Sequence, residues 1–331
     1  MQTTSNTAPL NGEAMSKRSL AYWLRIAVAV ALLLSLSQVI GFSDVLARIR
    51  DCPPGQTVLA FVLTLGMHGL AACRLRLLAK SQGFPLPAAE ALLVHLSSAF
   101  YSLFVPGGTA SGWAMRLVRL TRGTGRVAPA LQLLAGDRAL ATASGLAIGI
   151  VAGVLLAAKA PAWIVMVLLL LTTASTFVCL ALFSGTASGF PLSWMRGIPL
   201  LGRAIGKLEA RGTLLSRPDT ATLLKATGLS FAAHALGVMA WLVLAQALQV
   251  PLDPMAVAWI RSAAIAATLM PATIGGLGVR ESAVVYLASF AGVLAADALA
   301  WSLLVFAATV LSVGVLGGLL EAYSFSRQTD H

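Results

Sequence analysis

The sequence predicts an all-α polytopic membrane protein with six spanning helices, two re-entrant helical hairpins and an inverted internal repeat. Of its 331 residues, 58% are apolar and only 11% are charged, whereas soluble domains contain about 25% charged residues. Several stretches of about 18 or more residues carry no charge, as expected for helices in contact with lipid. These apolar runs do not alternate with a period of two. A transmembrane barrel is therefore excluded, along with a soluble globular enzyme.

The first half of the chain is predicted to form one membrane repeat over residues 17–158. The preceding residues 1–16 are small and polar, which is typical of a disordered tail. The apolar run over about 20–41 is too long for the core of a signal peptide, and no convincing cleavage site follows it. We therefore expect a retained span there. Further spans are expected over about 57–78 and 128–158.

Between these two spans, the segment 88–120 departs from a simple helix. Its apolar run stops at Val105-Pro106-Gly107-Gly108, and a second short helical pattern, TASGWAMRLVRL, follows at once. Neither part is long enough to cross a bilayer alone, so the segment is predicted to enter the membrane and return to the same side. Such irregular backbone survives at membrane depth only where protein or a water-filled cavity satisfies its polar groups.

The second half, residues 159–323, follows the same plan. Its long polar interruption, 184–222, has helical periodicity and a basic face, so we expect it along the cytoplasmic membrane surface. Residues 324–331 form a polar C-terminal tail. The expected spans of this half cover about 162–183, 223–248 and 298–323.

A second broken helix, over 255–291, is interrupted by the sequence PATIGGLG at 271–278. Each half contains an odd number of crossings, so the halves have opposite orientations and form an inverted repeat. The spacing agrees, because His68 precedes Pro106 by 38 residues and His234 precedes Pro271 by 37.

The formal net charge of +11 reflects basic loops beside apolar helices. With six spans and both termini inside, 17 of the 23 Lys and Arg residues fall on the inner side, as the positive-inside rule requires. Both termini are therefore expected in the cytoplasm. The same basic residues are expected to contact anionic lipid head groups.

Each broken helix predicts an anion site near the middle of the membrane. A helix that restarts exposes unpaired N–H groups at its positive dipole end, and these groups hold an anion. Glycines permit close approach, prolines end the preceding half-helix, and arginines that follow add full charge. The expected substrate-binding residues are Pro106, Gly107, Gly108, Ser111, Arg116, Arg119, Asp137, Arg138, Pro271, Gly275, Gly276, Gly278, Arg280 and Glu281.

Other interpretations of these residues stay open. A Pro-Gly-Gly break can mark only a kink or a helix crossing. Asp137 and Arg138 can form a structural ion pair or a gating pair, and the same choice applies to Arg280 and Glu281. Arg119 can belong simply to the inner basic collar.

Several further polar and small residues lie in or near the expected spans. Arg261 is expected near the outer interface, where snorkelling competes with substrate contact. For His68 and His234, packing within the bundle is favoured over proton coupling. The glycine run over 145–153 predicts close helix packing, within the monomer or across a homodimer.

Dispersed cysteines and histidines predict no metal site, and the sequence contains no P-loop or nucleophile elbow, so no cofactor is expected.

Four segments resemble the flippase-like domain family, the transmembrane region of lysylphosphatidylglycerol synthases. They are RLRLLAKSQGF, FYSLFVPGGTASGWAMR, the pair Asp137-Arg138 and MPATIGGLGVRES. The resemblance covers about 20–322 and implies that this membrane portion moves a lipid between leaflets. In two-part members a soluble aminoacyl-transferase domain makes the lipid, and we expect no such synthesis from this chain. The family often has Glu-Arg where this chain has Asp137-Arg138, which keeps the charge but shortens its reach.

These observations lead to the expectation of a bacterial inner-membrane translocase for a phosphate-bearing or aminoacylated lipid, and not of an enzyme. The expected partners are membrane lipids with anionic or phosphate head groups, a separate lipid-synthesis enzyme and a second copy of the chain; nucleic acid is not expected. The alternatives are a non-catalytic lipid-binding scaffold and an intramembrane enzyme acting on a lipid phosphate.

Overall fold

The computed structural model of the chain describes residues 42–105, 108–122, 124–156, 161–183, 218–269 and 276–329. Within these ranges the chain is helical and contains no strand. The expected tail 1–16, the span over 20–41 and nearly all of the basic segment 184–222 lie outside the described residues. The chain first enters the described part as a short helix, α2 (Phe42–Arg50).

Five of the six expected spans correspond to helices long and apolar enough to cross a membrane. The last span is one continuous run over Ala295–Ser326, in which α13 (Ala295–Val305) and α14 (Ser312–Thr329) are joined by the π-helical turn η1 (Phe306–Leu311). The other four are α3 (Pro54–Ser81), α6 (Val127–Leu155), α7 (Ala162–Leu182) and α10 (Thr220–Ala247).

Local chemistry explains where several of these helices begin. Pro54 opens α3, where proline costs nothing because the first helical N–H groups have no partner within the helix. Asp219 and Asp253 precede α10 and α11 (Pro254–Thr268), and each carboxylate accepts a backbone N–H of the first turn. Hydropathy therefore determines the helix interiors, while proline and aspartate determine the starts.

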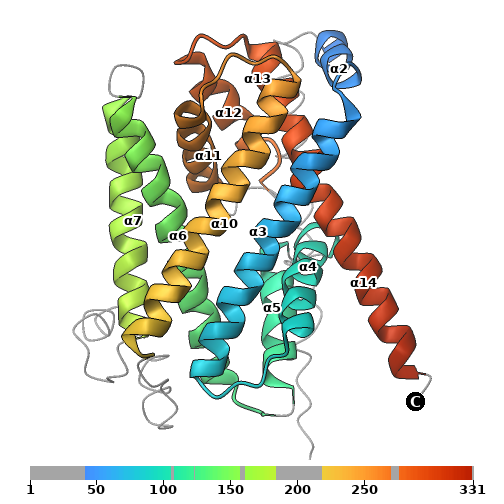
Figure 1. Cartoon of the computed structure of the whole chain (residues 1–331), viewed down its shortest axis with the longest axis vertical. Helices are drawn as coiled ribbons and strands as arrows, with labels where there is room; N and C mark the ends of the chain where they lie inside the picture. The colour runs from blue at the N-terminus through green and yellow to red at the C-terminus, as the bar shows by residue number, and fades with distance from the viewer. Residues whose placement is uncertain are drawn as a thin grey trace, which may run out of the picture.

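Two helical hairpins lie in opposite halves of the molecule. α4 (Ala88–Phe104) and α5 (Thr109–Thr121) occupy the lower half of Figure 1, and α11 and α12 (Val279–Ser289) occupy the upper half. At 1.5 Å per residue, even the longest of these helices is only about 26 Å long, less than the roughly 30 Å of a bilayer core. Each hairpin therefore reaches the interior without crossing the molecule.

The long helices pack against the two hairpins. α3 and α10 run side by side in opposite directions, as both views show. α4 packs on α14, and α11 packs on α6. Both contacts are made at glycines: a Cβ at Gly317 of α14 would collide with the backbone of Leu96, and one at Gly149 of α6 would collide with Ser262. The glycine run over 145–153 thus packs within the monomer.

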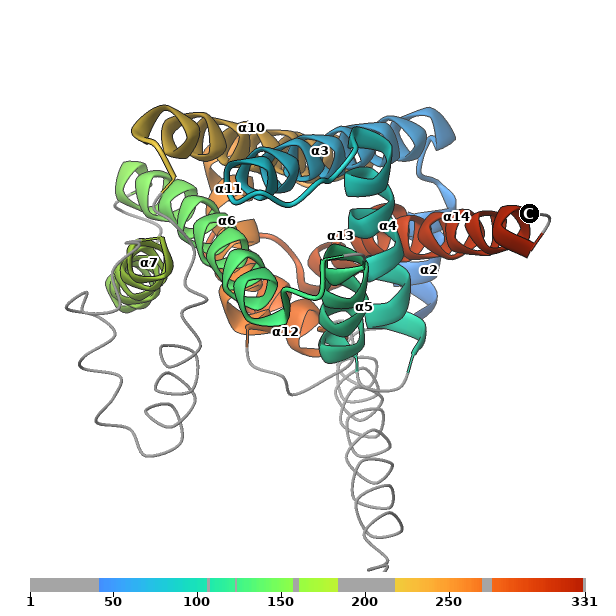
Figure 2. The ribbon, with the colours of Figure 1, turned by 90° about the horizontal axis from the view of Figure 1, so that it is seen from below.

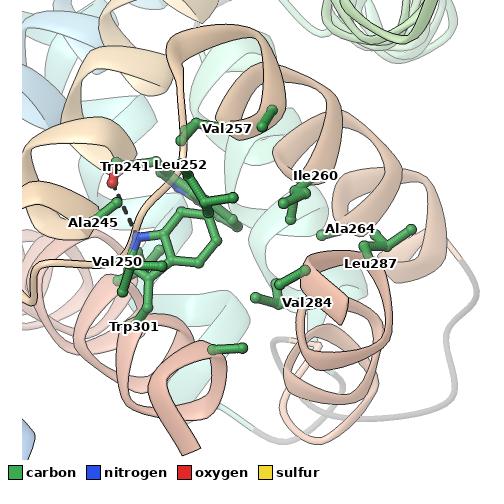
Figure 3. Close-up of a cluster of buried hydrophobic side chains, with 14 of the residues drawn as sticks. Trp241, Ala245, Val250, Leu252, Val257, Ile260, Ala264, Val284, Leu287 and Trp301 are labelled. Carbon is green, nitrogen blue, oxygen red and sulfur yellow. Dashed lines mark hydrogen bonds between the residues drawn. The ribbon is translucent and has the colours of Figure 1, made fainter. Parts of the chain in front are cut away.

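The upper half contains the largest cluster of buried apolar side chains (Figure 3). Trp241 of α10 and Trp301 of α13 meet edge to face with ring centroids 5.5 Å apart. The Trp301 indole Nε1 donates a hydrogen bond to the Trp241 carbonyl oxygen at 3.0 Å, so the polar atom of this fully buried ring is satisfied. Val284 of α12 and Ile260 of α11 belong to the same cluster, which therefore anchors the α11/α12 hairpin.

Candidate functional site

A cavity of about 300 Å³ lies in the interior, between the two hairpins. Its walls come from α3, α10, η1, α14 and both hairpins, with Ala99 contributed by α4. The polar and charged side chains that line it are Thr64, His68, Arg261, Thr268, Arg280 and Thr309.

Arg261 of α11 lies inside the bundle and not at an outer interface. Its side chain is buried, and one guanidinium nitrogen lies 3.4 Å from Nδ1 of His234, while another lies 3.8 Å from Sδ of Met67. Gly237 of α10 makes room for it, because a Cβ there would collide with the guanidinium. Snorkelling therefore does not describe Arg261 in this structure; it is a buried cation that lines a cavity.

His234 is oriented by two neighbours. Its Nε2 lies 2.8 Å from the carbonyl oxygen of Ala141, which can only accept a hydrogen bond. Nε2 therefore carries the proton, and in a neutral ring Nδ1 is then free to accept from Arg261. This geometry agrees with the expected packed polar role of His234.

Arg280 and Glu281 lie at the start of α12 and pair with each other. The guanidinium of Arg280 forms an ion pair with Glu281 Oε1, and it also stacks 4.8 Å from the ring centre of Phe306. The second oxygen of Glu281 accepts the N–H of Gly278 at 2.6 Å, and Gly278 has a positive φ of 82° that favours glycine. The N–H of Gly278 is thus held by a side chain of this protein, so it is not an open anion donor.

The start of α5 has no such cap. Gly108 precedes it with a positive φ of 57°, and no side chain caps the helix. Gly112 in the first turn lies so close to α4 that a Cβ would meet the carbonyl oxygen of Ser98 at 2.6 Å. Ser111 lies half-buried in this first turn. α5 is therefore held against α4 by backbone proximity and not by a capping carboxylate.

Arg116 lies one turn further along α5. It donates a hydrogen bond to Ser98 Oγ at 2.7 Å, and its charge acts on His68 and His95. The two histidine rings lie 6.3 Å apart, and the buried Nε2 of His95 has no hydrogen-bond partner among the described residues. His95 had no distinguishing signal in the sequence.

Asp137 pairs with Arg74 of α3 and not with its sequence neighbour Arg138. Both carboxylate oxygens accept from the Arg74 guanidinium, at 2.7 and 3.1 Å, and the same guanidinium donates to Ser230 of α10. Arg74 is buried. Arg138 is exposed on α6. Asp137 therefore does form an ion pair, as one interpretation expected, but its partner is Arg74 and not Arg138.

Arg119 is enclosed by two carboxylates. Its guanidinium contacts Glu90 of α4 at 2.9 Å and Glu321 of α14 at 2.6 Å, and Ser97 also donates to Glu321. These contacts connect α5, α4 and α14, so the side chain of Arg119 holds the hairpin in place and is not available to a ligand. The sequence does contain a signal for Glu321, because it is the one acidic residue within the last expected span, 298–323.

Four expected site residues, Pro106, Gly107, Pro271 and Gly275, lie outside the described residues. Gly276 has a positive φ of 77°, and a Cβ on it would meet the side chain of Thr268. The described glycines of both breaks thus have backbone conformations that disfavour a side chain.

Not every arginine near the two hairpins has an acidic partner. In the described part of the chain, Arg74 pairs with Asp137, Arg280 with Glu281, and Arg119 with Glu90 and Glu321. Three others have no carboxylate within 4.0 Å among those residues, and they are Arg116, Arg138 and Arg261.

Comparisons with known proteins agree with this membrane architecture. A search among curated proteins found no match. A family model described as the lysylphosphatidylglycerol synthase TM region matches residues 22–317, which is most of the chain and includes both hairpins. The protein is thus a multi-pass membrane protein, and it belongs to the lysylphosphatidylglycerol synthase transmembrane-region family.

Proposed function

We propose that the protein translocates a lipid across the bacterial inner membrane by passing its phosphate-bearing or aminoacylated head group through the central cavity. The observation that carries this proposal is a pair of arginines, Arg261 in the cavity wall and Arg116 of the α4/α5 hairpin, that lack a carboxylate partner in the described part of the chain. A charge inside a membrane protein is costly unless it is paired. An anionic head group is the partner that would compensate these charges.

The size of the cavity supports a head group as its occupant. Ligand cavities are typically about 300–1,000 Å³, and this one, at about 300 Å³, is at the small end. A phosphate with its substituent fits in such a volume, while two acyl chains do not. The chains would therefore remain in the surrounding lipid while the head group crosses.

The arrangement of the helices supports an inverted repeat. α3 and α10 run antiparallel side by side, and the hairpins enter from opposite ends. The contact of α4 with α14 corresponds to that of α11 with α6. Inverted repeats with broken helices at their interface are the common plan of alternating-access transporters, in which one half moves relative to the other around a fixed site.

The charge distribution supports an orientation with the lower end of Figure 1 in the cytoplasm. That end contains the ends of α3, α5 and α14 and the starts of α6 and α10. The C-terminus would then be cytoplasmic, and so would the N-terminus if a span crosses the membrane over about 20–41. The exposed cations of these segments are Arg76, Lys80, Arg122, Arg126 and Lys225.

The test is head-group transfer in proteoliposomes. Protein is reconstituted with fluorescent phosphatidylglycerol, and the fraction protected from an impermeant quencher is followed over time. Arg261→Gln should slow transfer by about tenfold or more, because a hydrogen bond to a charged group is worth about 1.5–3 kcal/mol. Arg122→Gln, which removes an exposed cation away from the cavity, is the matched control and should leave the rate unchanged.

Two outcomes would contradict the proposal. Transfer at the wild-type rate by Arg261→Gln would remove Arg261 from the pathway. No transfer by the wild-type protein, together with saturable retention of the same lipid, would favour the scaffold function; chemical turnover of the lipid would favour the enzyme.

A further inference from the structure

A second, separate hollow lies on the outer surface of the antiparallel pair α3 and α10. It is an open groove of about 680 Å³ near the lower ends of the two helices in Figure 1, and it has no lining residue in common with the central cavity. Three exposed cations line it, Arg76 and Lys80 from α3 and Lys225 from α10. None of the residues that line the groove is acidic.

The charge in the groove is confined to one end. Lys80 lies in the last turn of α3 and Lys225 in the second turn of α10, so both lie at the end of the bundle. Cys73, Gly228 and Ala232 line the part further inside. Along α3, Cys73 lies about 10 Å deeper than Lys80, at 1.5 Å per residue. The groove therefore offers cations at the membrane surface and small uncharged residues toward the bilayer core.

This gradient matches the chemistry of a phospholipid. A phosphate beside the three cations places its glycerol and acyl chains along the inner part of the groove, and basic hollows between membrane helices on the cytoplasmic side bind anionic head groups. Gly228 leaves the inner part open, because a Cβ there would have no atom within 4 Å. Asp219 lies close enough to act on Lys225 but is fully exposed and outside the lining.

We infer that this groove binds one anionic phospholipid of the surrounding bilayer, with its phosphate on Arg76, Lys80 and Lys225. The site is distinct from the translocation cavity and holds a resident lipid on the α3/α10 pair. A second copy of the chain is a poorer occupant, because a two-fold interface here would bring two sets of three cations together without an acid in the lining.

The first experiment is native mass spectrometry of the whole chain titrated with phosphatidylglycerol or phosphatidylcholine. The wild type should retain phosphatidylglycerol preferentially. Arg76→Gln/Lys225→Gln should weaken that binding by about fivefold for each cation removed. The matched control Arg50→Gln/Arg122→Gln removes two exposed cations that do not line the groove, and it should bind as the wild type does. Equal weakening in both double variants would overturn the site.

The second experiment uses the cysteine that the groove contains. Cys73 is exposed and lines the groove, while Cys52, at the α2–α3 junction, does not. In nanodiscs, phosphatidylglycerol should slow maleimide labelling of Cys73 relative to phosphatidylcholine and leave Cys52 unchanged, as read by peptide mass spectrometry. Glycerophosphate alone should not protect Cys73, since it lacks acyl chains; protection by it would identify a free-phosphate site and overturn the lipid assignment.

A steric variant tests the groove without changing charge. Gly228→Leu places a side chain in the open inner part, so it should abolish lipid protection of Cys73 while the unfolding midpoint stays at the wild-type value. Lipid protection that persists in Gly228→Leu would contradict the proposed path of the acyl chains. Efficient Cys73–Cys73 cross-linking by a short bismaleimide would show that a second copy covers this face and would overturn the proposal.

Discussion

The two hairpins differ in how their second helix begins and in how they are held against the rest of the molecule. α12 begins with a capping carboxylate of its own, since Glu281 accepts the Gly278 N–H and pairs with Arg280. α5 begins without a side-chain cap, and its hairpin is instead held through Arg119, which is enclosed by carboxylates on α4 and α14. Each hairpin thus contains one arginine whose charge is neutralised by carboxylates in a structural contact.

Among the described residues, each hairpin also contains one arginine without a carboxylate partner. In the α4/α5 hairpin it is Arg116, whose hydrogen-bond partner is the hydroxyl of Ser98, and in the α11/α12 hairpin it is Arg261, which contacts His234 and Met67. Proximity to a glycine break therefore does not show whether an arginine is paired, because Arg280 lies next to a break and is neutralised by Glu281. The arginines that we propose for ligand binding are the two without a neighbouring carboxylate.

The largest expected effect comes from removing the capping carboxylate of α12. Glu281→Gln leaves Arg280 buried and unpaired, so it should lower the free energy of unfolding by about 3–5 kcal/mol. Unfolding in detergent, followed by tryptophan fluorescence, measures the change. The double variant Arg280→Gln/Glu281→Gln should recover most of the loss, and failure to recover would show that the charge pair is not the cause.

The next effect separates the two arginines of the α4/α5 hairpin. Arg119→Gln should lower the free energy of unfolding by about 1.5–3 kcal/mol, because it takes charged hydrogen bonds from two carboxylates. Arg116→Gln should leave stability near the wild-type value and slow lipid transfer by about tenfold. Proteoliposome transfer rates and unfolding midpoints should be measured on both variants. The same profile for both would refute the division between structural and ligand-binding arginines.

A smaller effect tests how the first hairpin packs on α14. Gly317→Ala would push a methyl group into the backbone of Leu96, and overpacking of this kind costs about 1–3 kcal/mol. Gly314→Ala is the matched control, since its nearest neighbour is the end of the Leu103 side chain, which can move. The unfolding midpoint should fall clearly for Gly317→Ala and much less for Gly314→Ala; equal shifts would argue against a rigid backbone contact.

The smallest expected effect on stability comes from a helix cap outside both hairpins, so it can be compared with the effects of the hairpin variants. Asp219 caps α10, and the hydrogen bonds from Thr222 lower its pKa below the ordinary value of 3.8. A lowered pKa in the folded state means that the carboxylate stabilises the protein above its unfolded pKa and stops doing so as the pH falls through the folded value. The stability difference between the wild type and Asp219→Ala should therefore shrink toward pH 3. A constant difference would mean that the charge plays no part.

Much of the fold could be predicted from sequence because its causes are local. Long uncharged runs located five described spans, and glycine and proline located the breaks that make each hairpin. The glycine run over 145–153 indicated close packing, and the structure shows that α11 and α10 are the neighbours. The role of Glu281 was left open between two interpretations, because its contact with Gly278 depends on a left-handed residue at the helix start.

The sequence by itself therefore determined which segments lie in the membrane and where the two helices break, since hydropathy, chain stiffness and backbone freedom are properties of neighbouring residues. Only the tertiary structure decided which charges are neutralised. Arg74 meets an acid 63 residues away and Arg119 meets one 202 residues away, and such pairs depend on how the helices are rotated and where they cross. The same rotation leaves Arg116 and Arg261 without an acid among the described residues, so the charge that we propose binds the head group is a consequence of packing.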